Sequence, residues 1–310
     1  MALYAITGGA GFIGSHLADD VLADGHDVRV LDDLSTGRRA HLDPRAELIV
    51  ADVADPAALA RLLDGAEAVF HLAAIASVVR SSEDWAGTHR VNQGGSVAVL
   101  QAARQAGGMP VVYASSAAVY GDQPGPAHEA LIPLPLSAYG ADKLGSEIQA
   151  GVAFRVHGVP TCGLRFFNIY GPRQDPTSPY SGVISIFAAR IARGERLTIH
   201  GDGQQRRDFV HVSDAVRHLR AGLRLLRDQP QAAVVNVCTG TGTTILELAQ
   251  TLGRIAGRAP DTEFAPPRAG DIRVSVGEPD RARALLGIAA ATSLQDGLAM
   301  TLAAGGVLAA

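Results

Sequence analysis

The feature that most limits how this chain can fold is a glycine-rich turn near its N-terminus. An apolar run over residues 3–6 leads into Gly8, Gly11 and Gly14, spaced three residues apart, and a helical pattern follows. Glycine permits positive φ in such a turn, lets the backbone approach a diphosphate, and allows the helix to pack closely on its strand. The start of the helix then faces the anion. We therefore predict a strand, a phosphate-binding turn and a helix.

An acidic residue at the end of the next strand narrows the ligand class. The strand predicted over residues 27–31 is followed by Asp32. A carboxylate at this place can accept hydrogen bonds from the ribose hydroxyls of an adenosine. Because an acid disfavours a 2′-phosphate, the pattern predicts NAD rather than NADP, while the nearby Arg38 and Arg39 leave NADP as the alternative.

Composition excludes several functional classes. The 310 residues are 47% hydrophobic with 35 glycines, which is typical of a well-packed α/β enzyme. The net charge of -4 offers no basic surface for nucleic acid or an anionic membrane. Cys162 and Cys238 are too few for a disulfide framework and lack metal-ligand spacing, so we expect no metal and a reducing compartment. We see neither a signal peptide nor a membrane span, which predicts a cytoplasmic protein.

Strand and helix patterns alternate over the first half of the chain, which predicts an α/β fold built on a doubly wound parallel sheet of the Rossmann type. Ligands bind beyond the carboxyl ends of such strands. Asp52 follows the third strand and reaches the adenine or, alternatively, caps the helix that starts near Pro56. The predicted cofactor contacts are Gly8, Gly11, Phe12, Ile13, Gly14, Asp32, Asp52, Val53, Leu72, Ala73, Ala74, Asn92, Tyr139 and Lys143.

The second half of the chain alternates strands with irregular segments. Strands are predicted over residues 159–168, 197–200 and 233–237, and helices over 183–193 and 213–227, with two or three more helices after residue 245. This pattern predicts a smaller, discontinuous C-terminal substrate domain. Residues 1–168 with about 204–240 would form the NAD-binding domain, and about 169–203 with 241–310 the substrate domain.

A serine, a tyrosine and a lysine form a candidate catalytic group. Tyr139 and Lys143 are four residues apart in a predicted helix and share one face, and Ser116 follows a predicted strand. A free tyrosine titrates near 10, so a phenolate base near pH 7 needs about 4 kcal/mol of stabilisation. The Lys143 ammonium and a positively charged nicotinamide would supply it. The alternative is that both residues simply lie on a helix surface.

Together these motifs resemble the extended short-chain dehydrogenase/reductase family, over essentially the whole chain. The segments 115–122, 164–168 and 207–212 further resemble nucleotide-sugar epimerases such as the UDP-galactose 4-epimerases. The resemblance implies tightly held NAD and a UDP-hexose substrate. Tyr139 would remove the proton of the sugar C4 hydroxyl while C4 gives hydride to NAD. The 4-keto sugar would then rotate and take the hydride back on its other face.

One difference from related enzymes favours epimerisation. The related 4,6-dehydratases carry an Asp-Glu pair after the catalytic hydroxyl, and the UDP-glucuronate decarboxylases carry a Glu. This chain has Ala117 and Ala118 there. Without a carboxylic acid beside the substrate, elimination of water lacks its proton donor and base.

The same resemblance implies the contacts with a UDP-sugar. Asn168 and Arg207 would hold the diphosphate, and Arg268 would close over it. The other implied contacts are Asp271 at the uridine ribose, Thr198 and His200 at the uracil, and Ser116, Val183 and Ser275. Ser275 would form a wall of the hexose pocket, where a small side chain leaves space for an N-acetyl group. Arg207 could instead pair with an acidic segment and His200 could be a surface residue, and Arg173, Gln174 and Tyr180 are further candidates.

Two other functions remain open from the sequence. A UDP-hexuronate 4-epimerase would need a cation for the sugar carboxylate, for which Arg80 and Arg173 are candidates. A regulatory protein could keep NAD binding without turnover, but the presence of all three catalytic residues argues against it. The resemblance also implies a homodimer formed by helices near residues 85–106 and 137–157, unless Val152 and Phe154 face the chain's own sheet.

Overall fold

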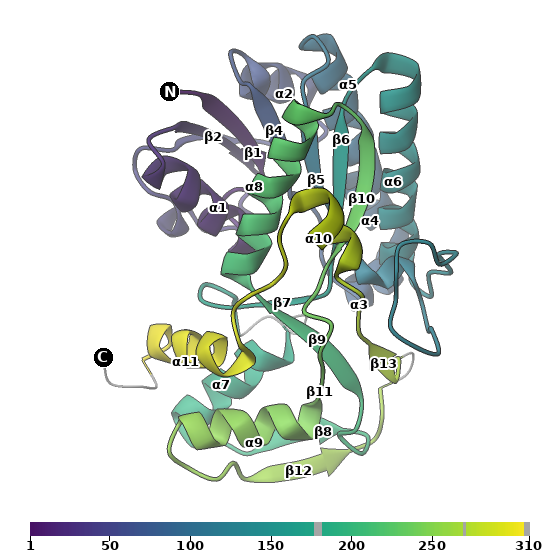
Figure 1. Ribbon diagram of the computed structural model, residues 1–310. Coiled ribbons are helices and arrows are strands. Elements are labelled where there is room, and N and C mark those ends of the chain that lie inside the picture. The colour runs from purple at the N-terminus through teal and green to yellow at the C-terminus, as the bar shows by residue number, and fades with distance from the viewer. Residues whose placement is uncertain (177–181, 269–270, 307–310) are drawn as a thin grey trace.

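The larger region of the protein is a parallel sheet covered by helices on both faces (Figure 1). The computed structural model describes residues 1–176, 182–268 and 271–306. Seven strands lie in the order β10-β6-β5-β4-β1-β2-β3. Their bounds are β1 (Leu3–Thr7), β2 (Asp27–Asp32), β3 (Glu47–Val50), β4 (Ala68–His71), β5 (Val111–Ser116), β6 (Thr161–Phe166) and β10 (Ala232–Val237). The predicted α/β class and doubly wound sheet are confirmed.

Two apolar clusters hold the helices on the sheet. One face packs against α1 (Phe12–Ala23), α8 (Val212–Asp228) and α10 (Asp280–Leu286), through side chains such as Leu17 and Leu219. The other face packs against α2 (Pro56–Leu63), α5 (Gly95–Gln105) and α6 (Ala138–His157), through side chains such as Leu62 and Val99. Two short helices, α3 (Val78–Glu83) and α4 (Trp85–His89), contact α6.

The strand order reverses between β1 and β4. From β1 the chain winds outward through β2 and β3, and from β4 it winds the other way through β5 and β6. Ligands of doubly wound sheets bind beyond the carboxyl ends of the strands at this point of reversal. The glycine turn after β1 and the residues after β4 therefore flank the expected binding crevice.

The smaller region lies beyond the carboxyl ends of the large sheet (Figure 1). Strand β9 (Arg206–His211) pairs with β7 (Asn168–Tyr170), β11 (Gly242–Thr244) and β13 (Val274–Ser275), and β8 (Leu197–His200) pairs with β12 (Thr262–Ala265). Helices α7 (Val183–Arg193), α9 (Ile245–Ile255) and α11 (Leu294–Ala304) share the third apolar cluster with these strands. The division predicted from the sequence assigns β9 to the larger region, but β9 pairs within the smaller sheet.

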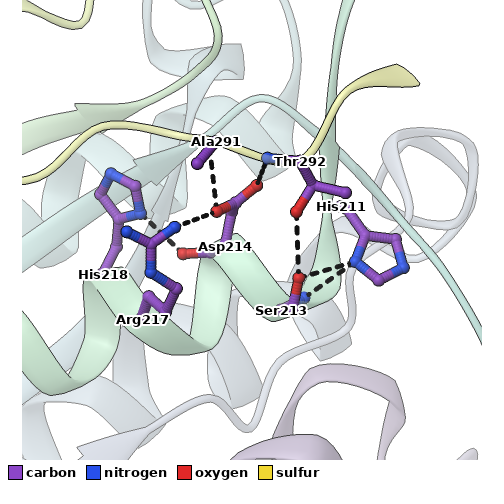
Figure 2. A network of polar contacts seen from close by, with 7 residues as sticks. All are labelled: His211, Ser213, Asp214, Arg217, His218, Ala291 and Thr292. Atoms are coloured by element: carbon purple, nitrogen blue, oxygen red, sulfur yellow. Dashed lines mark hydrogen bonds and ion pairs between the residues drawn. The ribbon is translucent and has the colours of Figure 1, made fainter. Parts of the chain in front are cut away.

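A polar network joins the two regions where β9 runs into α8 (Figure 2). Asp214, in the first turn of α8, accepts hydrogen bonds from the backbone N–H groups of Ala291 (3.1 Å) and Thr292 (2.9 Å). Arg217 pairs with the same carboxylate at 2.7 Å. The connection that leads into α11 is thereby attached to a helix of the larger region.

Local sequence signals explain most helix boundaries. The side chain of Asp55 caps α2 by accepting from the N–H groups of Ala57 and Ala58, with Pro56 at the first helical position. The alternative role of Asp52 as the cap of this helix is therefore wrong. Within the described residues, no helix is both long and apolar enough to cross a membrane.

Candidate active site

The glycine turn has the geometry that its spacing predicts. Gly8 has φ +70°, and a Cβ there would lie 2.6 Å from the backbone nitrogen of Ala73. A Cβ on Gly14 would collide with the carbonyl oxygen of Gly8. Helix α1 begins directly after Gly11, and no described side chain caps it. Its first N–H groups are left for an anionic ligand, as a dinucleotide diphosphate requires.

Asp32 is fixed at the end of β2 by two backbone groups. Its carboxylate oxygens accept from the N–H of Ala10 at 3.0 Å and from the N–H of Leu34 at 2.9 Å. Burial raises the pKa of this carboxyl, and the two backbone hydrogen bonds oppose that shift. Because each carboxylate oxygen can accept more than one hydrogen bond, Asp32 still has acceptor capacity for ribose hydroxyls.

A cavity of about 570 Å³ extends from the glycine turn to the catalytic candidates. It brings together most of the predicted cofactor residues with the predicted catalytic ones. The predicted residues that line it are Gly8, Gly11, Phe12, Ile13, Gly14, Asp32, Asp52, Val53, Leu72, Ala73, Ala74, Ser116, Tyr139, Lys143 and Asn168. Asp52 also accepts from the N–H of Ala54 and from Arg90, each at 2.8 Å.

Asn92 is the predicted cofactor residue that does not line this cavity. Its side chain is buried, accepts from the N–H of Ile75 at 2.8 Å and donates to the carbonyl of Ile75 at 3.2 Å. Ile75 itself lines the cavity. Asn92 therefore fixes the backbone that follows β4 and shapes the cavity through it.

The catalytic candidates converge from β5 and α6. The Tyr139 hydroxyl hydrogen-bonds the Ser116 side chain, and the Ser116 Oγ accepts from the N–H of Ala118 at 3.1 Å. Lys143 Nζ lies 5.8 Å from the centre of the Tyr139 ring and donates to the carbonyl of Ala114 at 2.8 Å. The alternative of two independent surface residues is wrong, since Tyr139 is partly buried and Lys143 fully buried.

A buried ion pair between β6 and α6, to which a serine of β5 is hydrogen-bonded, lies beside these residues. Glu147 accepts from the Ser115 hydroxyl at 2.5 Å and from two guanidinium nitrogens of Arg165, at 2.7 and 2.9 Å. Glu147 lies one turn after Lys143 on α6, and Ser115 precedes Ser116 on β5. The Ser115 hydrogen bond to Glu147 therefore links β5 to α6 beside Ser116 and Lys143, and the bidentate pair with Arg165 of β6 fixes Glu147 in place.

The protonation of Tyr139 differs from the expectation. Burial raises the pKa of the phenol, and the hydrogen bond with Ser116 only partly opposes this. The expected net lowering does not occur in the protein alone, because burial of the phenol outweighs what favours its charged form. Burial lowers the pKa of Lys143 to about 8. In the protein alone, Tyr139 is therefore a neutral phenol at pH 7.

The Lys143 pKa predicts an alkaline limit on activity. Its ammonium is charged below about pH 8 and is lost as the pH rises through that value. Since the charge favours the phenolate, we expect kcat/KM of the NAD-loaded protein to fall above about pH 8. Arginine stays charged throughout this range, so Lys143→Arg should be less active but should lack the alkaline fall. Identical alkaline limbs in the two proteins would contradict this assignment.

Comparison with known proteins identifies the family. A model of the NAD dependent epimerase/dehydratase family matches residues 4–238. The chain belongs to this epimerase/dehydratase family. NAD is the family's cofactor, so the prediction drawn from Asp32 is confirmed and the NADP alternative is not supported.

Three similar proteins show the extent of the likeness. The UDP-glucose 4-epimerase of Mycolicibacterium smegmatis is 39% identical over 306 residues, which span 96% of each chain. The structure of the Thermotoga maritima UDP-glucose 4-epimerase with UDP-glucose is 36% identical, with a TM-score of 0.93 over 99% of each chain. The UDP-N-acetylglucosamine 4-epimerase of Methanobrevibacter ruminantium is 32% identical, with a TM-score of 0.92 over 98% of each chain. These relatives make the chain an enzyme of the epimerase/dehydratase family.

Several predicted substrate residues lie around a second cavity, in the smaller region. This cavity has a volume of about 780 Å³, and His200, Arg268 and Asp271 line it. Arg207 forms an ion pair with Asp271, so the alternative of an acidic partner for Arg207 is realised in this structure. Asn168 pairs with Phe209 on β9, two residues after Arg207. Because side chains alternate along a strand, Asn168 and Arg207 lie on the same face of the sheet.

Three of the other substrate candidates, Ser275, Thr198 and Val183, do not line either cavity. Ser275 pairs with Arg207 across β13 and β9. Thr198 accepts from Arg190 at 2.8 Å and donates to Glu263 at 2.9 Å. Val183 begins α7, directly after Gly182, which lines the first cavity. Tyr180, Ala269 and Gly270 lie outside the described residues.

The sequence identified only part of the cavity lining that follows β4, namely Leu72, Ala73, Ala74 and, as a candidate cation, Arg80. Asp84, Gly87 and Arg90, which it did not single out, also line the first cavity. A π-helical segment, Arg90–Gly94, interrupts the helix that the sequence suggested over residues 85–106. Such segments often occur at functional sites. These residues could have been predicted from their position: they follow the end of β4, one of the two strands between which the strand order reverses.

Proposed function

We propose that the protein is a UDP-hexose 4-epimerase that interconverts UDP-glucose and UDP-galactose through a 4-keto intermediate. The observation that carries this proposal is the hydrogen-bonded pair of Ser116 and Tyr139, which lies in the same cavity as the glycine turn. One cavity therefore combines the features that bind a dinucleotide with the groups that would act on a substrate hydroxyl.

The residues after the catalytic serine support epimerisation over elimination. Ala117–Val119 forms a short 3-10 turn, and its side chains carry no acid. Elimination of water needs a proton donor and a base beside the substrate. Epimerisation at C4 needs only one group that takes and returns the hydroxyl proton.

Each catalytic residue then has one task. As a phenolate, which the positive charges of Lys143 and bound NAD would favour, the Tyr139 oxygen accepts the C4 hydroxyl proton and later returns it. The Ser116 hydroxyl orients the sugar oxygen through a hydrogen bond. Lys143 adds positive charge next to the phenol. Bound NAD supplies hydride acceptance at C4 and return to the opposite face.

The protein must also hold the nucleotide firmly and the hexose loosely, because the keto sugar has to rotate before it presents its other face to the cofactor. Asn168 and Arg207 lie on one face of the smaller sheet, and Arg268, Asp271 and His200 line the adjacent second cavity. We assign these residues to the diphosphate and the uridine. Arg207 would exchange its Asp271 partner for phosphate oxygens, which are equally good bidentate acceptors.

Direct assay tests the proposed function. The purified protein is incubated separately with UDP-glucose, UDP-N-acetylglucosamine and UDP-glucuronate, and the epimers are resolved by chromatography. We expect UDP-galactose to form from UDP-glucose. Conversion of none of the three sugars would refute the proposal.

Ser275 predicts that the N-acetylated substrate is also accepted. Ser275 lies opposite Arg207 in the smaller sheet and is partly buried. A small side chain at this wall leaves space for the N-acetyl group. We expect Ser275→Tyr to reduce turnover of UDP-N-acetylglucosamine by about tenfold or more, the effect of a steric clash of ~1.4 kcal/mol, and to spare UDP-glucose. Unchanged turnover of the acetylated sugar would show that Ser275 is not the wall; Ser275→Ala is the control.

A second candidate is a UDP-hexuronate 4-epimerase. Arg80 lines the first cavity and would supply the cation for a sugar carboxylate. Arg173, the other cation considered, instead pairs with Asp19 at 2.6 Å. Preferential conversion of UDP-glucuronate in the same assay, lost in Arg80→Gln, would favour this candidate.

We further propose a cytoplasmic homodimer. Ile148, Val152 and Val156 lie along α6 at 58%, 38% and 66% exposure, and Trp85 on α4 is 68% exposed. Val152 therefore does not face the chain's own sheet. An apolar face of this kind is expected to pack against a second copy. Light scattering should give about twice the chain mass of 32.1 kDa, and a mass of one chain would contradict the dimer.

A further inference from the structure

Residues 171–176 follow β7 and cross from the smaller region to the cofactor side of the larger one. We call this segment the clasp. One of its residues, Gln174, lines the same cavity as the glycine turn and Asp32. Other side-chain contacts join the clasp to residues 16–41, which surround the glycine turn.

Three side-chain contacts of 3.0 Å or shorter attach the clasp to the larger region. Arg173 donates to Asp19 of α1 at 2.6 Å, and Arg38 donates to Asp175 at 2.7 Å. His16, also on α1, donates to the carbonyl oxygen of Pro172 at 3.0 Å. The contacts join segments that are far apart in the sequence, so the three-dimensional fold alone brings them together.

The backbone of the clasp is strained at the residue that makes the first contact. Arg173 has φ +67°, a left-handed conformation that L-residues other than glycine, asparagine and aspartate rarely adopt. Such a conformation persists only where surrounding contacts hold it. The Arg173 side chain supplies such contacts itself, through the ion pair with Asp19 and the 3.4 Å hydrogen bond to the His41 carbonyl.

The partners of the clasp also contact the glycine turn. The backbone N–H of Arg38 donates to the carbonyl of Ala10 at 2.9 Å. The ring of His16 lies edge-on to Phe12 at 6.0 Å, and Phe12 lines the cavity. Arg38 and His16 each contact both the clasp and the glycine turn. A displacement of the clasp would therefore shift the turn that faces the diphosphate.

From these contacts we propose that Arg173 and Arg38 are positioning residues for NAD: through their ion pairs they hold the clasp, and with it Gln174, against the cofactor cavity and slow cofactor release. An epimerase that regenerates its cofactor in every turnover gains from slow release. Arg38 is thereby engaged by Asp175 and is not left as a cation for a 2′-phosphate.

The size of the effect follows from the exposure of the two pairs. The side chains of Arg173 and Asp19 are 30% and 38% exposed, and those of Arg38 and Asp175 are 58% and 37% exposed. Pairs of this kind contribute modestly and are screened by salt. We expect loss of either pair to speed NAD release by about two- to fivefold.

The test measures NAD release without any sugar nucleotide, so its result is independent of the proposed substrate. Protein loaded with radiolabelled NAD is diluted into excess unlabelled NAD, and the release rate is followed at low and at high salt. The variants are Arg173→Asp, Asp19→Arg, the double exchange of both, Arg38→Ala, and Arg173→Lys, which keeps the charge. Aspartate at position 173 tolerates the positive φ better than most residues.

The matched control is Asp24→Asn, which removes the ion pair of Asp24 with Arg220 at 2.6 Å. Asp24 caps the C-terminal end of the same helix α1, away from the clasp. We expect NAD to be released faster from Arg173→Asp, Asp19→Arg and Arg38→Ala than from the native protein. The double exchange and Arg173→Lys should release NAD within about twofold of the native rate. The control should release it at the native rate. Release from the native protein should quicken with salt, and release from Arg173→Asp, which keeps only the pair of Arg38 with Asp175, should quicken less. Unchanged rates in the single variants, failure of the double exchange to recover, or an equal effect in Asp24→Asn would each overturn the proposal.

Discussion

Tyr139→Phe is expected to lower the epimerisation rate by about a thousandfold, the range that a positioned proton-transfer group supplies. The substitution removes the one oxygen that hydrogen-bonds Ser116 in the cavity and leaves the ring in place. Lys143 keeps its hydrogen bond to the Ala114 carbonyl, so the fold and the cofactor site should persist. Turnover of UDP-glucose, NAD content by absorbance and far-UV circular dichroism measure the three properties separately.

Tyr4→Phe provides the matched control, because Tyr4 is a buried tyrosine of β1 outside the cavity. Its turnover should stay near that of the native protein. If Tyr139→Phe turned over UDP-glucose at the native rate, the catalytic assignment would fail. A cellular function that survives the substitution would instead favour an NAD-binding regulatory protein.

Gly14→Ala is expected to abolish retention of NAD. A Cβ at this position would collide with the carbonyl oxygen of Gly8, which is rigid backbone and not a movable side chain. The collision displaces α1 from the turn, so the first N–H groups of the helix no longer point at the diphosphate. We expect purified Gly14→Ala to contain no bound NAD and to need at least about a hundredfold more NAD for activity, the loss of ~3 kcal/mol. Cofactor content after purification and an NAD titration of activity measure this.

Gly94→Ala is the control for a glycine-to-alanine change in a helical segment. The nearest atom to an added Cβ there is the His89 carbonyl oxygen at 3.7 Å, an ordinary contact. That variant should keep its NAD and be slightly stabilised, since alanine favours helices over glycine. Native levels of bound NAD in Gly14→Ala would mean that the turn tolerates the shift and that the spacing of its glycines is not essential.

The cofactor half of the site could be predicted because short-range patterns determine it. Gly8, Gly14 and Asp32 lie at strand ends that apolar runs mark in the sequence, and the parallel sheet then places all carboxyl ends at one edge. Tyr139 and Lys143 share a helix face for an equally local reason. Asp52 was ambiguous because Asp55, three residues later, offers the same capping chemistry.

The rest depended on contacts between distant segments. The raised pKa of Tyr139 follows from burial, which no local pattern reveals. The ion pairs of Arg207 with Asp271 and of Arg173 with Asp19 join parts of the chain that sequence alone cannot pair. The second cavity arises from β8, β12 and the segment before β13, so the substrate residues could be named only by resemblance and not located.

The position of β10 in the large sheet affects how the chain folds as it is synthesised. Strand β6 is buried at every residue and pairs with β5 on one side and β10 on the other. Its second edge therefore stays open on the ribosome until β7, α7, β8, β9 and α8 have all been made. Open apolar edges attract other strands, so the nascent chain passes through an aggregation-prone stage that ends only when residues 232–237 emerge and close the sheet.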